Sequence, residues 1–165
     1  MQEPKIIESS EKPLVGICVQ MSFVVDRTSE LWRTFGSQIG EIQGRVSSDR
    51  YSVKIYDLNY SFSKFDPAAR FQKWAAVETS DKEDLPEGFE ALTIPAGMYA
   101  VFTYRGTPAN APEIYGHIFG VWLPNSEFEL DLRPHFEILS ESYDPLDENS
   151  EETIWIPIKD KVGGI

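Results

Sequence analysis

The sequence contains one cysteine, Cys18, in 165 residues, so an internal disulfide is impossible. It also lacks any run approaching the roughly 18 apolar residues of a membrane helix, and no basic and then apolar leader opens it. We therefore expect a cytoplasmic protein that is not inserted in a membrane.

Positive charge is scarce. The chain has 15 Lys and Arg against 27 Asp and Glu, a formal net charge of −12. Phosphate binding requires a surplus of basic residues, so direct nucleic-acid binding is not expected. A solvated acidic surface is the commonest reason for such a balance, which also suits cationic or neutral partners.

The motifs of several enzyme classes are missing as well. The sequence has no phosphate loop, no dinucleotide glycine pattern and no Gly-x-Ser-x-Gly elbow. His117 and His135 have no zinc-ligand spacing, and the acidic run 141–152 lacks the glycine and regular alternation of a calcium loop. We therefore predict no metal and no cofactor, and interpret 141–152 as a solvated loop.

The length favours one domain, 1–165, and aromatic residues make up 13% of it, more than a core of this size needs. Some of them are therefore expected to line a groove. Apolar alternation and turn residues predict strands and helices, with an acidic connector at 81–88. The predicted strands are 4–10 and 14–21 (joined by a turn at 11–13), 51–57, 71–79, 89–94 and 98–105 (around a turn at 95–97), 135–139 and 153–158; the predicted helices are 29–43 and 109–123.

The order of these elements repeats. Phe35-Gly36 recurs 84 residues later, Val53 matches Phe136 at an offset of 83, and Trp74 matches Trp155 at an offset of 81. We interpret this as a tandem duplication of a strand–helix–strand–strand unit, with repeat 1 at about 4–80 and repeat 2 at about 89–159. The predicted fold is α+β: an antiparallel sheet with both helices on one face, since each helix has one apolar stripe to bury, and a ligand groove on the other face.

Glu137 is the most informative residue, because it is a carboxylate inside the apolar strand HFEIL. Burial of that carboxylate costs free energy unless it is paired or protonated. If the isoleucines of strand 153–158 face the helices, alternation places Glu137 and Trp155 together on the open face. The alternative is a solvent-facing position or a salt bridge to Arg133 or Arg105.

Aromatic residues are predicted to complete the site. Trp74 and Trp155, with Tyr56 and Tyr104 as neighbours, could stack on a flat ligand or a cation. Tryptophan at matched repeat positions is equally suited to a core, and this alternative stays open.

The segments LTIPAGMYAVFTYRG, IFGVWLPNS, RPHFEIL and TIWIPIK resemble the GyrI-like small-molecule-binding domain. That domain is also the effector-binding module of AraC- and MerR-type transcription regulators. The resemblance implies a pseudo-twofold fold with a ligand groove between its repeats, gives Glu137 the role of the family's acidic residue, and places Trp155 beside the groove. Trp74 follows from the repeat alone. Because the chain begins almost directly in a strand, we expect a stand-alone version.

Three functions follow from the resemblance. The first is binding of bulky, lipophilic, often cationic small molecules, for sensing or sequestration, with Glu137 as the orienting charge. The second is hydrolysis of cyclopropane-bearing genotoxins, with Glu137 as general base and Tyr104 assisting. The third is binding of a protein partner, as in gyrase-inhibiting relatives, through the acidic surface. The ligand's identity and the oligomeric state stay open.

Overall fold

The computed structural model describes residues 3–62, 64, 66–81 and 83–162. Its strands are β1 (Lys5–Ser9), β2 (Lys12–Met21), β3 (Arg50–Ile55), β4 (Phe71–Glu78), β5 (Glu90–Ile94), β6 (Gly97–Arg105), β7 (Phe128–Leu130), β8 (His135–Leu139) and β9 (Glu151–Asp160). Helix α1 (Thr28–Gln38) runs into the turn η1 (Ile39–Glu41). A second helical stretch comprises η2 (Pro108–Asn110), α2 (Ala111–His117), the π-helical η3 (Ile118–Trp122) and α3 (Leu123–Asn125).

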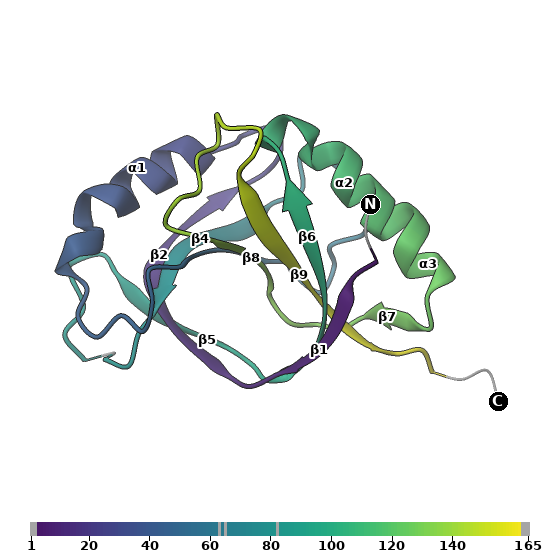
Figure 1. Ribbon diagram of the computed structural model, residues 1–165, viewed down its shortest axis with the longest axis horizontal. Coiled ribbons are helices and arrows are strands. Elements are labelled where there is room, and N and C mark those ends of the chain that lie inside the picture. Colours follow the sequence, from purple (N-terminus) through teal and green to yellow (C-terminus); the bar gives the residue numbers. More distant parts are fainter. Residues whose placement is uncertain (1–2, 63, 65, 82, 163–165) are drawn as a thin grey trace.

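All strand pairs are antiparallel, and the sheet order is β1-β6-β9-β8-β3-β4-β2-β5, with β7 added beside β9. Strands β6, β9 and β8 come from the second half of the chain, and β3, β4 and β2 from the first, in mirrored order about the β8–β3 contact (Figure 1). The α+β class and the two strand–helix–strand–strand units are thereby confirmed.

The outermost strands do not pair as predicted. β1 pairs with β6, and β5 pairs with β2, so neither 4–10 with 14–21 nor 89–94 with 98–105 forms a hairpin. Ser9 pairs with Gly97, and Lys12 pairs with Ile94. The link between β1 and β2 therefore lies opposite the link between β5 and β6, in one continuous register. The predicted turns at 11–13 and 95–97 are therefore extended chain, and one long antiparallel ribbon joins the two halves.

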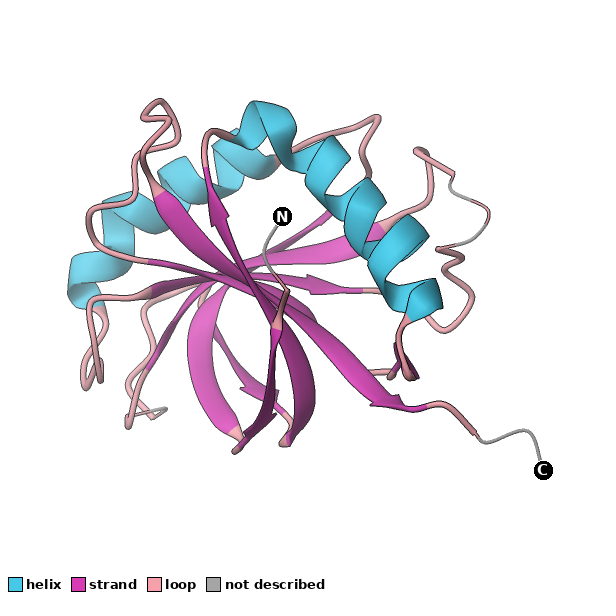
Figure 2. Cartoon of the chain, turned by 45° about the vertical axis from the view of Figure 1, so that its right-hand side comes forward, coloured by secondary structure: helices cyan, strands magenta, loops and turns pink. Residues whose placement is uncertain are grey.

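Both helical stretches cover the same face of the sheet (Figure 2). Helix α1 buries Leu31 and Phe35, four positions apart, against small and branched residues of β2 and β4. The second stretch packs Ile118 against alternate residues of β6 and β9, among them Phe102 and Ile156. Among the described residues, no helix is both long enough and apolar enough to span a membrane.

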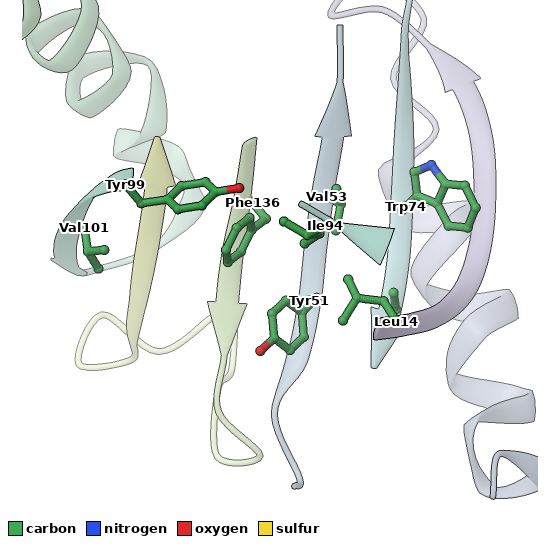
Figure 3. Packing of buried hydrophobic residues seen from close by; sticks show 9 residues of the cluster. Leu14, Tyr51, Val53, Trp74, Ile94, Tyr99, Val101 and Phe136 are labelled. Atoms are coloured by element: carbon green, nitrogen blue, oxygen red, sulfur yellow. The ribbon is translucent and has the colours of Figure 1, made fainter. Parts of the chain in front are cut away.

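The other face curls around a cluster of its own (Figure 3). Its buried members come from strands across the whole sheet: Leu14, Tyr51, Val53, Trp74, Ala76, Ile94, Tyr99, Val101 and Phe136. Strands β1 and β5 contribute to closing this side, since Ile7, Leu92 and Ile94 pack against or within the cluster. The helix-free face is thus filled by an apolar core.

Candidate functional site

The strand register decides which residues share a face. Ser52 is the direct partner of both Ala75 and Glu137, and Glu137 is in turn the partner of Ile154. Directly opposed residues of antiparallel strands point to the same side. Since Ala75 and Ile154 pack under the helices, Glu137 lies on the helix face.

The neighbouring row runs on the opposite face. Val53 is the partner of Trp74 and Phe136, and Phe136 is the partner of Trp155. The prediction that Glu137 shares a face with Trp155 and Trp74 is therefore wrong, and the candidate site lies on the helix face instead of the other one. Alternation had given the two faces of each strand, but a shift of one residue between two strands exchanges them.

Both tryptophans pack with the helix-free cluster. Trp74 is 5% exposed, and its indole N–H donates to Gln72 Oε1 at 3.2 Å. Trp155 stacks on Phe136 with ring centroids 5.1 Å apart and planes 19° from parallel. Trp155 also borders the small cavity beside Glu137.

Two side chains, Tyr115 and Lys54, contact the Glu137 carboxylate. The Tyr115 hydroxyl, from α2, donates a hydrogen bond to Oε1, and Lys54 Nζ, from β3, lies 3.8 Å from the same oxygen. Burial by itself raises the pKa of Glu137, but Lys54, Lys73 and the Tyr115 hydroxyl favour the ionised form and together lower the pKa below its ordinary value. Burial, followed by the charge of Glu137, raises the pKa of Tyr115, which keeps its hydroxyl a donor. The site thus holds a buried, ionised carboxylate.

A second carboxyl joins the first. Glu152 belongs to β9 and is the partner of Leu139 and Tyr104, so it lies on the helix face and outside the solvated loop predicted for 141–152. Burial, then the charge of Glu137 and a hydrogen bond to it, raise the pKa of Glu152 to about 8. The pair therefore shares one proton, held by Glu152.

Two lysines stand beside the pair. Lys54 is the direct partner of Lys73 on one side and of His135 on the other. Burial, then repulsion by Lys54, lowers the pKa of Lys73 to about 8. Burial likewise lowers the pKa of His135 to about 3, so this imidazole is neutral at pH 7. Across the described part of the chain, no three His, Cys, Asp or Glu side chains gather as metal ligands.

An aromatic wall of Tyr56, Phe62, Phe119 and His135 borders the site. The Phe62 ring stacks on the His135 ring, with centroids 5.4 Å apart and planes 11° from parallel. Its centroid also lies 5.0 Å from the ring centroids of both Tyr56 and Phe119. Three members of this wall, Tyr56, Phe119 and His135, line a cavity beside Glu137 that measures about 10 Å³. That is room for about one water molecule.

Of the predicted neighbours, Tyr56 reaches the site and Tyr104 does not contact Glu137. Burial, then the charge of Glu137, raises the pKa of Tyr56. The Tyr104 hydroxyl donates instead to the Thr107 carbonyl, and its ring packs in the core beneath α2. The alternative interpretation, a salt bridge of Glu137 to Arg133 or Arg105, is not found among the described ion pairs, where these arginines pair with Asp131 and Glu151.

Sequence reasoning missed five site residues: Lys54, Lys73, Tyr115, Phe119 and Glu152. Three of them carried a signal. Lys54 precedes Glu137 by 83 residues, the offset that relates Val53 to Phe136. Tyr115 and Phe119 are four residues apart in the helical stretch and stack with planes 13° from parallel. Lys73 and Glu152 are identified as site residues only by their burial.

Known proteins resemble this chain in sequence or in fold. The chain is 28% identical over 155 residues to the transcriptional regulator BrlR of Pseudomonas aeruginosa; the match covers 93% of this chain and 54% of BrlR, so the chain spans about half of that regulator. The structure of SAV2435 bound to tetraphenylphosphonium matches with a TM-score of 0.74 at 17% identity, covering 96% of this chain and 94% of that one. The EcmrR C-terminal domain matches with a TM-score of 0.74 at 11% identity over 96% and 98% of the two chains.

The two structural likenesses are of fold, since both identities are low. The family model of the GyrI-like small molecule binding domain matches residues 2–159, which is nearly the whole chain. This chain belongs to the GyrI-like small-molecule-binding domain family.

Proposed function

We propose that this protein binds bulky lipophilic cations at the helix-face site, with Glu137 as the anchor of the positive charge. One observation carries the proposal: a buried carboxylate that stays ionised lies next to aromatic rings. Such a carboxylate pays a desolvation cost, which a cation offsets without demanding a particular shape. The bound tetraphenylphosphonium of SAV2435 is a ligand of this class.

Aromatic residues supply the apolar contact. Tyr56 and Phe119 line the cavity beside Glu137, and Phe62 packs against both of them. Each cation–aromatic contact contributes about 0.5–2 kcal/mol. Because the cavity has room for only about one water molecule, a tetraaryl cation enters only when the aromatic wall opens.

Hydrolysis by the same glutamate is the weaker alternative. A general base acts best when its pKa lies near the working pH, and Lys54, Lys73 and Tyr115 lower the pKa of Glu137. We propose that binding serves effector sensing or sequestration. For effector sensing, we propose that this domain acts as part of a longer regulator, as the partial match to BrlR suggests.

The test is calorimetric titration of the protein with tetraphenylphosphonium, alongside Glu137→Gln. We expect binding to weaken about tenfold or more in the variant, or about 1.4 kcal/mol. The matched control is Glu129→Gln, which removes an exposed carboxylate that lies 3.8 Å from Lys159, the same spacing as in the Lys54–Glu137 pair. Equal binding by all three proteins would remove Glu137 from recognition. No binding to the unaltered chain would favour the hydrolase or the protein-partner function.

A further inference from the structure

The two central strands carry opposite charges at equivalent positions. Val53 on β3 is the direct partner of Phe136 on β8, and these residues are related by the repeat offset of 83. The next residue along each strand is Lys54 in one repeat and Glu137 in the other. Both side chains point to the helix face, so the duplication has placed a lysine beside the glutamate that anchors the proposed ligand.

Lys54 contacts the groups that a ligand cation would use. Its ammonium nitrogen lies 3.8 Å from Glu137 Oε1 and 4.5 Å from the centroid of the Tyr115 ring. The Lys54 and Glu137 side chains are only 14% and 15% exposed. A carboxylate on one side and an aromatic face on the other are the two elements of a cation site. In this structure the site already contains a cation, and that cation belongs to the chain.

We propose that Lys54 is a tethered competitor, which occupies the cation position of the site so that a cationic ligand binds only by displacing its ammonium group from Glu137 and Tyr115. This inference rests on the proposed function and names the residue that sets its specificity.

Displacement selects ligands by their apolar area. A ligand that offers only charge replaces the Lys54 ammonium with another cation and gains little binding free energy. Lys54 has the advantage in this exchange because it is attached to the chain. A tetraaryl cation adds burial of its rings against Phe62, Phe119 and Tyr56, and removal of apolar surface from water favours binding. The expected ligand class is therefore cations shielded by large aromatic surfaces, with small ammonium ions excluded.

The experiment compares tetraphenylphosphonium binding to the unaltered chain, Lys54→Met and Lys54→Arg. Methionine keeps the apolar stem and removes the competitor, so we expect binding to tighten about tenfold or more. Arginine keeps a cation on Glu137, so no tightening is expected. Lys159→Met is the surface control, because it breaks an exposed ion pair of the same 3.8 Å spacing. Lys73→Met removes a neighbouring buried charge for which no ion pair with Glu137 is found among the described residues.

A second measurement uses the unaltered chain. Acetylation of Lys54 by a limiting amount of an amine-reactive ester, followed by mass spectrometry, reports whether its ammonium is held in the site. Displacement predicts that saturating tetraphenylphosphonium increases Lys54 acetylation severalfold and leaves Lys159 acetylation unchanged. This readout does not depend on whether any variant folds.

The outcomes separate the two proposals. If the unaltered chain binds through Glu137 but Lys54→Met binds no more tightly, Lys54 is not a competitor and the proposed function stands. Equal tightening in Lys73→Met and Lys54→Met would assign the effect to overall charge and overturn displacement, as would unchanged Lys54 acetylation. If no variant binds tetraphenylphosphonium, both proposals fall.

Discussion

Glu137 and Glu152 are the same residue type, but their surroundings separate their pKa values. Glu137 faces Lys54, Lys73 and the Tyr115 hydroxyl, which favour its ionised form. Glu152 is raised to a pKa of about 8 by burial and then by the charge of Glu137. Glu137 therefore carries the negative charge of the pair and Glu152 carries its proton, as in other buried carboxyl pairs.

The protonated state of Glu152 predicts a pH-dependent stability. Its pKa is about 8 in the folded chain against an ordinary value of 4.5, so the folded state binds the extra proton between these two pH values. Stability from this group is present below pH 4.5 and is lost as the pH rises through about 8. Glu152→Gln removes that loss, so the variant should melt at a higher temperature than the unaltered chain near pH 8.5 and at about the same temperature near pH 4.5.

Thermal melts at the two pH values check this expectation. Glu151→Gln is the control, since Glu151 is an exposed residue on the same strand that pairs with Arg105. A shift in melting temperature of the same size at both pH values for Glu152→Gln would contradict the assignment of the shared proton.

At the scale of the strand, each of β3, β4, β8 and β9 has two different faces. Ser52, Lys54, Glu137 and Glu152 present the site to the helices. The intervening residues form the apolar cluster of the other face (Figure 3). The strands that hold the site are therefore fixed from behind by close packing, which gives the ionised residues defined positions.

Substitution of Trp74 tests whether the two faces of the sheet have separate roles. It lies in the helix-free cluster and does not line the cavity at Glu137. We expect Trp74→Phe to lower the free energy of unfolding by about 1–3 kcal/mol while tetraphenylphosphonium affinity stays within about twofold. Phe119→Leu, on the helix face, should instead weaken binding more than it lowers stability. Denaturant unfolding and titration of both variants measure the two effects, and a large loss of affinity in Trp74→Phe would place this tryptophan in the ligand site.

At the scale of the whole molecule, the two repeats are not separate units. Strand β1 of the first repeat lies on the edge of the second, and β5, which precedes the second repeat's β6, lies on the edge of the first (Figure 1). Each half therefore completes the sheet of the other, and the β8–β3 contact joins them in the middle.

The exchange predicts that neither half folds by itself. Residues 1–88 and 89–165, expressed separately, should lack cooperative melting, because each would expose strands that pair only with the other half. Mixing the two fragments should restore strand content and a melting transition. Circular dichroism of each fragment and of the mixture measures this, and a cooperative transition in either fragment alone would show that the repeats are independent.

Much of the fold was determined by the sequence itself. The apolar stripes of Leu31 and Phe35 and of Ile114 and Ile118 predicted two helices on one face, and alternation predicted the strands that follow them. The repeat offsets predicted the duplication, and the carboxylate of HFEIL identified Glu137 as the residue to explain. These signals are local or periodic, so they can be read along the chain without knowing which strands meet.

The tertiary structure decided what depends on pairing. The register of β8 against β9 placed Glu137 on the helix face and Trp155 on the other, and the pairing of β1 with β6 turned two predicted hairpins into one ribbon. Burial revealed Lys73 and Glu152, which the sequence presented as ordinary charged residues. Register and burial arise from contacts between distant segments, and a shift of one residue exchanges the faces of a strand without changing its pattern.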